Sequence, residues 1–351
     1  MINKKNSKLK TIRKYGFWGA IDRKRHYLLK RLADKTGWLS KREVPDFLNI
    51  EPTSFCNLKC RLCPTGNDIL GRDKGFMTLD VFKKILSGWN GKRTRIDFGG
   101  FGEPLLNKDF LEMVRVSKDK GFDISIFTNG NLLTPEISSA LVSLKADRII
   151  MSVDGATQET YGWYRRGGDL IRVISNLNAF VKIKREQKSN LPNMELQFVV
   201  MKKNESELDI IKKIALEVGV DKLILKACGF YSFIGMNFDE FKKDYLPVNK
   251  KYRRLEDENN PIPGFVCPWI NHGAMILWNG KIAACCYDSH GEVILGDINE
   301  TNFIDQWQNS LKYKIFRKNA VKGIYPYKVC KLCPAKFRVT KGENIVLKPI
   351  N

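Results

Sequence analysis

Six short apolar runs recur between residues 46 and 228, and stretches with helical periodicity separate them. Each run is rich in branched or aromatic side chains and has the length of a β-strand. The runs lie at 46–52, 95–100, 123–129, 148–154, 194–201 and 222–228. Nearly continuous apolar strands that alternate with helices predict a parallel sheet with helices outside it. The periodicity fits both an open doubly wound sheet and a partial barrel.

Three of the expected helices have recognisable starts. Thr78 precedes the amphipathic run LDVFKKILSG, and Asn107 precedes KDFLEMVRVSKDK, which stops at Gly121. Thr134 precedes Pro135, and proline is favoured at the first helical position. Threonine and asparagine side chains accept hydrogen bonds from the first backbone N–H groups of a helix. We therefore expect these three residues to cap three helices.

Composition bounds the cellular setting. The chain has 351 residues, nine cysteines and a net charge of +22. An odd number of cysteines excludes complete disulfide pairing, and no apolar run approaches the roughly 20 residues of a membrane-spanning helix. The run YGFWGAI near the N-terminus is too short and too aromatic for a signal peptide. We therefore expect a cytoplasmic protein, in which clustered cysteines indicate metal binding or catalysis.

Positive charge is densest before Leu32, where Asp22 is the only acid. This basic arm fits a solvated lysine-rich surface, an amphipathic helix on an anionic membrane, or nucleic-acid binding. No recognised nucleic-acid motif accompanies the charge, so we expect no nucleic-acid partner. Peripheral contact with the inner face of a membrane stays open.

Three cysteines, Cys56, Cys60 and Cys63, follow the first expected strand with the spacing C-x3-C-x2-C. Thiolates bind soft metals, as zinc or as iron–sulfur clusters. A structural zinc site is closed by four ligands, whereas three local ligands leave one position for a substrate or cofactor. On spacing alone, a chance cluster of packed or zinc-bound cysteines is the alternative.

Unusual short motifs end the next three expected strands. GGFGEP ends the second strand, TNG the third and SVDG the fourth. The carboxyl ends of parallel strands are where α/β folds bind ligands. Taken singly, GEP and TNG are ordinary turn-forming sequences. No G-x-G-x-x-G follows the first strand, which argues against a dinucleotide site.

In this order and at these strand ends, the motifs resemble the radical S-adenosylmethionine (SAM) superfamily over residues 46–228. The resemblance implies an α/β fold, a partial (β/α)6 TIM-like barrel, and a [4Fe–4S] cluster whose open iron binds SAM. It implies reductive cleavage of SAM to a 5′-deoxyadenosyl radical that abstracts hydrogen from a substrate. Phe101 replaces the first glycine of the family's GGEP motif. The implied cluster ligands are Cys56, Cys60 and Cys63, and the implied SAM contacts are Leu62, Gly102, Glu103, Pro104, Asn129, Ser152 and Asp154.

The remaining cysteines lie at or beyond the sixth expected strand. Cys228 ends that strand and is expected to be a buried small hydrophobe. The spacing of four others resembles the SPASM/Twitch extension, which holds an auxiliary [4Fe–4S] cluster; a zinc knuckle is the alternative. The G-x4-C spacing favours Cys285 over Cys286, although both stay open. No cysteine follows the last of them, so the resemblance implies a single auxiliary cluster with the ligands Cys267, Cys285, Cys330 and Cys333.

Among single-cluster members, the chain resembles enzymes of the 2-deoxy-scyllo-inosamine dehydrogenase type. This implies an oxidoreductase that oxidises a hydroxyl-bearing carbon of a sugar, cyclitol or glycan precursor. A reductase, flavodoxin or ferredoxin would supply electrons. A peptide-modifying maturase and an epimerase or isomerase are the alternatives. The catalytic base is not identified, because a solvated hairpin turn explains Tyr287, Asp288 and His290 equally well.

The same patterns divide the chain into five segments. We expect a basic helical arm at 1–45 and the barrel at 46–235. A charged, proline-bearing connector at 236–265 leads to the auxiliary-cluster domain at 266–340, which reads as a β-hairpin followed by a helix. Residues 341–351 are expected to form an exposed tail.

Overall fold

The computed structural model describes residues 44–89, 94–229, 236–253, 265, 267, 269–331, 333, 335 and 342–347. The basic arm expected at 1–45 therefore lies almost entirely outside the described residues, as does much of the second half of the expected connector. No helix within the described ranges is long and apolar enough to cross a membrane.

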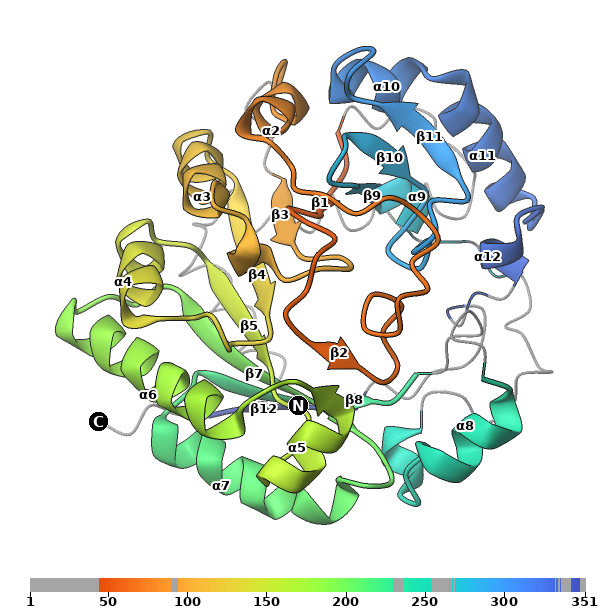
Figure 1. The fold of residues 1–351 in the computed structure, drawn as a ribbon. Helices are drawn as coiled ribbons and strands as arrows, with labels where there is room; N and C mark the ends of the chain where they lie inside the picture. Colours follow the sequence, from red (N-terminus) through yellow and green to blue (C-terminus); the bar gives the residue numbers. More distant parts are fainter. Residues whose placement is uncertain are drawn as a thin grey trace, which may run out of the picture.

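A curved sheet forms the centre of the fold, and its six middle strands run parallel (Figure 1). These strands match the six expected apolar runs. They are β1 (Phe47–Ile50), β3 (Arg95–Phe98), β4 (Asp123–Thr128), β5 (Arg148–Ser152), β7 (Asn193–Val200) and β8 (Lys222–Ala227). The sheet curves without closing, so the fold is a partial barrel and the open doubly wound alternative is excluded.

Helices cover the convex side of this sheet (Figure 1). They are α2 (Leu79–Ile85), α3 (Phe110–Asp119), α4 (Pro135–Ser143), α5 (Gln158–Tyr164), α6 (Leu170–Glu186) and α7 (Leu208–Val218), with the short 3₁₀ turns η2 (Pro104–Leu106) and η3 (Glu205–Glu207). The expected caps Thr78 and Thr134 are confirmed, because their side chains accept from the N–H groups of Val81 and Ile137.

The expected cap at Asn107 is wrong. Helix α3 begins at Phe110, and its N-cap residue is Asp109. The side-chain oxygen of Asn107 accepts from the N–H of Asp109 at 2.9 Å. Its side-chain nitrogen donates to the carbonyls of Pro52 and Met77 at 2.7 and 2.9 Å. Asn107 therefore braces three loops, because its amide has more partners there than one helix end offers.

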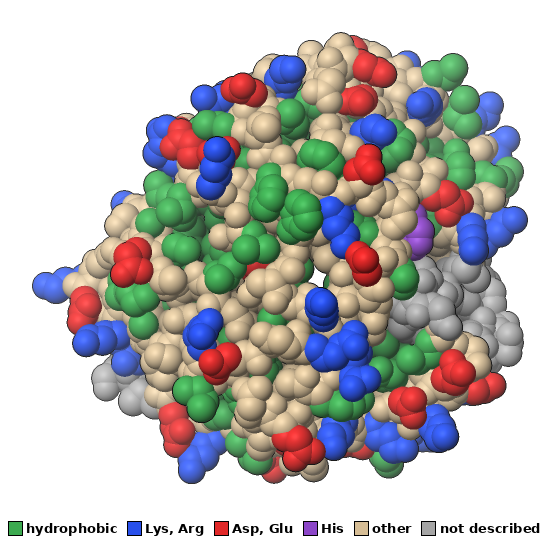
Figure 2. Space-filling model, in the orientation of Figure 1, with side chains coloured by type: hydrophobic (Ala, Val, Ile, Leu, Met, Phe, Trp, Pro, Cys, Tyr) green, Lys and Arg blue, Asp and Glu red, His purple; other side chains and the backbone are tan. Residues whose placement is uncertain are grey.

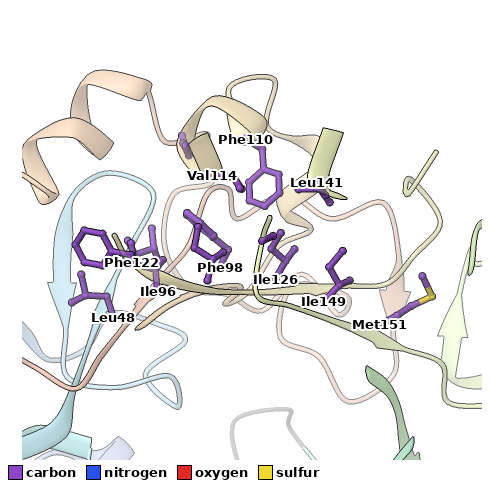
Figure 3. Packing of buried hydrophobic residues seen from close by; sticks show 14 of the residues in the cluster. Leu48, Ile96, Phe98, Phe110, Val114, Phe122, Ile126, Leu141, Ile149 and Met151 are labelled. Atoms are coloured by element: carbon purple, nitrogen blue, oxygen red, sulfur yellow. The ribbon is translucent and has the colours of Figure 1, made fainter. Parts of the chain in front are cut away.

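The main hydrophobic core fills the space between the sheet and the helices (Figure 3). Alternate strand residues such as Leu48, Ile96 and Ile126 point into it, where they meet Phe110 and Val114 of α3. Each of these side chains is buried, and full burial of one such side chain stabilises the fold by about 1.5–3 kcal/mol.

The other face of the strands is more polar than nearly continuous apolar runs would predict. Asn49, Asp97, Ser125 and Arg148 are neighbours in register across β1, β3, β4 and β5. The Arg148 guanidinium donates to the Ser125 hydroxyl at 2.8 Å and lies 3.8 Å from the carboxylate of Glu195. The concave side of the sheet thus carries hydrogen-bonding groups.

The C-terminal part continues the same sheet. Strand β9 (Gly273–Ile276) pairs in parallel with β1, and β10 (Lys281–Ala283) and β11 (Ile294–Asp297) follow in antiparallel order. Strands β9 and β10 form the expected hairpin. The helices of this part are α9 (Trp269–His272), α10 (Phe303–Asn309), α11 (Leu311–Val321) and α12 (Lys328–Lys331).

Two expectations about the ends of the barrel change. The connector contains α8 (Phe238–Asp244), with an N-terminal capping box formed by Asn237 and Glu240, and the 3₁₀ turn η5 (Lys250–Tyr252). The expected exposed tail is wrong for part of its length, because Glu343–Val346 forms β12, which pairs antiparallel with β8. An edge strand offers unpaired N–H and C=O groups, and β12 satisfies those of β8.

Candidate iron–sulfur and SAM site

The loop that carries the first three cysteines crosses the open side of the curved sheet (Figure 1). Cys56 lies after β1, and Cys60 ends β2 (Lys59–Cys60), which pairs with β6 (Arg165–Arg166). The N–H of Cys63 donates to the carbonyl of Cys60 at 3.2 Å. All three thiols are half-buried. The three predicted ligands therefore lie in one loop and share a partly buried environment.

Two residues that the motif does not include shape this loop. The side-chain amide of Asn67 donates to the carbonyls of Cys60, Arg61 and Cys63 at 3.3, 2.7 and 2.8 Å. A β-carbon on Gly66 would stand 2.5 Å from the backbone N and O of Cys60. Only glycine therefore allows the backbone to approach this closely.

The protonation of the thiols depends on what binds them. The pKa of Cys56 is raised to about 11 and that of Cys60 to about 12, mainly by burial and to a smaller extent by the neighbouring cysteines. Such thiols stay protonated at neutral pH unless a cation stabilises the thiolate. Three neighbouring, half-buried thiols suit a metal cluster better than they suit free nucleophiles.

Glu103 of the GEP motif is buried, and protein groups surround its carboxylate. It accepts from the Thr128 hydroxyl at 2.7 Å, from the Asn129 N–H at 2.8 Å and from the Leu105 N–H at 3.3 Å. Burial raises its pKa, and these hydrogen bonds oppose the rise. Glu103 therefore ties the ends of β3 and β4 together, directly beside the cysteine loop.

Asn129 faces the cysteines. Its side-chain nitrogen donates to Asn57 Oδ1 at 2.8 Å and lies 3.9 Å from the sulfur of Cys56. Gly102 has no room for a side chain, because a β-carbon would lie 2.0 Å from the carbonyl oxygen of Thr53. Pro104 is buried and starts η2. The second and third strand-end motifs and the cysteine loop thus form one site.

The remaining predicted SAM contacts lie farther along the sheet. Asp154 is fully buried, where it pairs with Arg165 at 2.6 Å and accepts from the Val199 N–H at 2.7 Å. Arg165 of β6 lies opposite Cys60 of β2 in the antiparallel pair of these two strands. The ion pair of Asp154 with Arg165 therefore helps to fix the strand that carries Cys60. Ser152 accepts a long bond of 3.4 Å from Gln197.

Leu62 is buried in a small apolar cluster beside the cysteine loop. Cys228 belongs to the same cluster and is 1% exposed, so its expected role as a buried small hydrophobe is confirmed. The other buried members are Met201, Phe241, Tyr245 and Leu246.

Sequence reasoning missed a buried ion pair beside this site. Glu51 follows β1, and its carboxylate lies 2.6 Å from the guanidinium of Arg72. Burial raises the pKa of Glu51, and Arg72 opposes that rise. Arg72 also donates to the carbonyl of Ser289 at 2.8 Å and lies over the ring of Phe101. In the sequence, the charged residue Glu51 directly after an apolar strand could have indicated a buried ion pair. The sequence did not show which residue was its partner.

A second group of cysteines surrounds a cavity in the C-terminal part. Cys267, Cys285, Cys330 and Cys333 line it together with apolar side chains that include Phe316. Burial raises the pKa of Cys285, and the neighbouring Cys286 adds to the rise. The four cysteines predicted as auxiliary ligands therefore meet at one place.

The neighbouring residues distinguish Cys285 from Cys286. Cys285 lines the cavity, whereas Cys286 is absent from the described residues that line it. Asp288 is buried and accepts from the N–H groups of Glu292 and Val293 at 2.8 and 2.9 Å, so solvation of the turn, which the sequence left open as one explanation, does not account for this residue. Asp288 therefore holds the backbone of the turn together. His290 is exposed and lies against Gly71, in the segment after the first cysteine loop.

The number of cysteines around the cavity suits a metal cluster. Four thiols around a shared cavity fit a [4Fe–4S] cluster, which cysteine thiolates hold at its corners.

A partial α/β barrel with three cysteines at its open side, extended by a four-cysteine unit, defines an iron–sulfur protein of the radical SAM class. Residues 50–214 match the family model of the radical SAM superfamily, and residues 267–334 match the model of the SPASM iron–sulfur cluster-binding domain. The chain belongs to the radical SAM superfamily and carries a SPASM domain. Its cofactors are [4Fe–4S] clusters and SAM.

Proteins with differently named activities are similar to this chain. The chain is 27% identical to the tungsten-containing aldehyde ferredoxin oxidoreductase cofactor-modifying protein of Pyrococcus furiosus, over 80% of this chain and 85% of that protein. It is 26% identical to the AdoMet-dependent heme synthase of Methanosarcina barkeri, over 89% and 97% of the two chains. The crystal structure of BtrN in complex with AdoMet and 2-DOIA matches with a TM-score of 0.53 and 18% identity, over 87% and 99%. The structural likeness establishes the fold.

Proposed function

We propose that this radical SAM enzyme is an oxidoreductase that oxidises a hydroxyl-bearing carbon of a sugar, cyclitol or glycan precursor. The observation that carries the proposal is the cavity lined by Cys267, Cys285, Cys330 and Cys333. A cluster held by four thiolates has no position left for a substrate. Such a cluster suits electron transfer, and an oxidation needs an electron acceptor.

The proposal assigns the two cysteine groups separately. Cys56, Cys60 and Cys63 would hold the cluster that binds SAM, because three ligands leave one iron open. Together with SAM, that cluster supplies a 5′-deoxyadenosyl radical that removes a hydrogen atom from the substrate. The remaining work falls to the protein, which must hold SAM and the substrate in one geometry and keep water away.

The SAM contacts in the proposal follow from the strand ends. Gly102 would bring its backbone close to SAM, and Asn129 would approach it from beside Cys56. Glu103 and Asp154 already have protein partners, so their role would be to hold the ends of β4, β6 and β7 in place. Pro104, Ser152 and Leu62 would complete the binding surface.

The concave face supports a polar small-molecule substrate. Asn49, Asp97 and Ser125 form a polar row across adjacent strands, in which Asp97 accepts from Arg95 and Ser125 accepts from Arg148. Lys59 and Arg166 are exposed on the loop side, and Figure 2 shows basic side chains around a hollow in the middle of that face. A polyhydroxylated molecule, alone or linked to a phosphate, matches these groups. Substrate oxidation releases one hydrogen atom, one proton and one electron, and the auxiliary cluster would accept the electron.

A variant that lacks the auxiliary cluster tests the proposal. Cys330→Ala/Cys333→Ala protein, reconstituted without oxygen, should keep about four of about eight iron atoms. It should still cleave SAM, but it should form no carbonyl product. The substrate source is a small-molecule extract of cells grown in deuterated medium, and deuterium should appear in 5′-deoxyadenosine. Cys286→Ala is the matched control and should behave as wild type.

Two results would overturn the proposal. Full product formation by the folded double variant would show that the auxiliary cluster takes up no electron. Recycling of SAM, with deuterium returned to the product, would point to an epimerase or isomerase. Circular dichroism must accompany both measurements, because loss of a structural metal can unfold a small unit. Deuterium transfer from a peptide fraction only would favour the maturase.

A further inference from the structure

The C-terminal part of the chain has an uneven charge distribution. Residues 306–342 contain ten lysines and arginines and no aspartate or glutamate. Helix α11 and the short helix α12 lie within this stretch, next to the four-cysteine cavity. Six of these ten basic residues are exposed lysines that the structure places on α11, at its end or on α12, beside one of the two proposed cluster sites.

Helix α11 has two different faces. Its inner face packs Tyr313 and Phe316 into the core, and Phe316 also lines the cavity. Its outer face exposes lysines together with Leu311 and Ile315, which are 70% and 49% exposed. Figure 2 shows basic and hydrophobic side chains next to one another along the margin where Figure 1 places α11. The exposed lysines are Lys312, Lys314, Lys318 and Lys322.

The basic surface continues to the rim of the cavity. Lys328 and Lys331 are exposed on α12, and Cys330 between them is only half-buried. The carboxylate of Glu292 accepts from the N–H groups of Lys328 and Val329 at 2.8 and 3.2 Å. This carboxylate thus fixes the start of α12, so that Cys330 stays at the cavity.

We propose that the exposed lysines of α11 and α12, with Leu311 and Ile315, form the docking surface for a small acidic electron-transfer protein. The basic surface complements an acidic partner, and the exposed apolar side chains provide contact area at its centre. A partner on this face would lie about one helix width, roughly 10 Å, from the cavity. In each encounter the cluster at the cavity, reduced by substrate oxidation, would pass one electron to the oxidised partner, so that the cluster is reoxidised, the partner is reduced and no covalent bond changes.

An anionic membrane is the other surface that lysines and apolar side chains attract. A membrane contact gives no reason for the basic face to lie over the four-cysteine cavity, whereas an electron carrier does. The docking proposal rests on the proposed function, because only a redox use of the cavity calls for a carrier.

Charge reversal tests the docking surface. The variant Lys312→Glu/Lys314→Glu/Lys318→Glu reverses three exposed charges on α11. Its matched control, Lys182→Glu/Lys188→Glu/Lys213→Glu, makes the same change in net charge on the exposed faces of α6, α7 and the turn after α6. The probes are an acidic ferredoxin and an acidic flavodoxin. Their equilibrium binding to the holoenzyme is measured anaerobically at about 20 and about 300 mM salt.

At low salt, the α11 variant should bind both probes at least about tenfold more weakly than wild type. The control variant should stay within about twofold of wild type, and salt should remove most of the difference. Equal weakening in both triple variants would overturn the proposal, because it would reflect net charge alone. So would failure of wild type to bind either probe. Loss of binding to phosphatidylglycerol vesicles with unchanged probe binding would assign the surface to a membrane.

Chemical reduction separates this proposal from the proposed function. Dithionite reduces the clusters without docking, so the α11 variant should cleave SAM at the wild-type rate when dithionite is the donor. If wild type fails to cleave SAM with dithionite, the proposed function is wrong. If wild type cleaves SAM normally with dithionite, but the α11 variant binds both probes as tightly as wild type does, only the proposed docking surface is wrong.

Discussion

Gly66 lies where the cysteine loop turns back on itself, and a β-carbon there would stand 2.5 Å from the backbone of Cys60. We expect Gly66→Ala to displace Cys60 and to remove about four of about eight iron atoms together with SAM cleavage. Iron analysis and measurement of 5′-deoxyadenosine check this. Gly162→Ala in α5 is the control, because its nearest neighbour is the flexible end of Gln158 at 3.2 Å. An active Gly66→Ala protein would contradict the loop geometry.

The choice between two adjacent cysteines is also decided at the scale of single residues. Cys285 lines the four-cysteine cavity together with Cys330 and Cys333. Cys285→Ala should therefore lose about half of the iron, whereas Cys286→Ala should keep nearly all of it. Iron and sulfide analysis of both proteins, reconstituted side by side, gives the answer. The opposite pattern would assign the ligand to Cys286.

Residues that carry their chemistry in a local pattern could be predicted from the sequence. The three cysteines of the first loop and the GEP motif are examples, because their spacing is itself the signal. The ion pair between Glu51 and Arg72 could not be predicted from the sequence. The position of Arg72 depends on tertiary contacts, such as its hydrogen bond to the carbonyl of Ser289, 217 positions away. Asn67 was missed for a different reason, because an asparagine in a loop is ordinary until its three carbonyl partners are known.

At the scale of elements, the apolar runs predicted the six parallel strands from β1 to β8, because a buried strand needs a run of core residues. The polar side chains on the concave face of these strands were not predicted. Strands packed on both faces would be apolar on both, whereas the concave face of a partial barrel is available to bind a polar ligand. Strand β12 was missed because Glu343–Val346 is short and alternates between half-buried and exposed side chains. Its position depends on the free edge of β8, which lies more than a hundred residues earlier.

Strand β12 gives an element-scale prediction. The N–H of Leu347 donates to the carbonyl of Asp221, so in the antiparallel ladder Ile345 faces Leu223 in a hydrogen-bonded pair. Ile345→Pro removes that donor and should destabilise the edge by about 1–2 kcal/mol. Amide hydrogen exchange should rise in Lys222–Ala227.

Two further variants separate the ladder from side-chain packing. The N–H of Asn344 points away from β8 in this register, so Asn344→Pro should leave exchange in β8 nearly unchanged. Ile345→Ala keeps the N–H but removes the packing of the side chain against the core. If Asn344→Pro opened β8 as much as Ile345→Pro does, the register of β12 would be wrong.

At the scale of the whole molecule, one sheet joins the barrel to the SPASM domain through the parallel pairing of β1 with β9. The pair Glu51–Arg72 lies at this junction, with side-chain exposures of 0% and 11%. Arg72→Met leaves a buried carboxylate without its cation, which should cost about 3–5 kcal/mol. Glu51→Gln/Arg72→Met should cost less than the sum of the single changes, because it removes both charges.

Thermal unfolding of the reconstituted proteins measures this coupling. Arg115→Met, which breaks an exposed ion pair with Glu112 on α3, should leave the melting temperature unchanged. Additive effects of the two changes at Glu51 and Arg72 would show that the pair does not hold the two parts together.

The cluster expected at the first cysteine loop should cleave SAM, and cleavage can be measured in one assay. Wild-type protein and the variants Cys60→Ala and Cys286→Ala are reconstituted without oxygen and incubated with SAM and dithionite. Wild type and Cys286→Ala should both form 5′-deoxyadenosine and methionine in equal amounts, whereas Cys60→Ala should form neither. A wild-type protein that holds stoichiometric zinc and forms no 5′-deoxyadenosine would show that this loop does not hold a SAM-cleaving cluster.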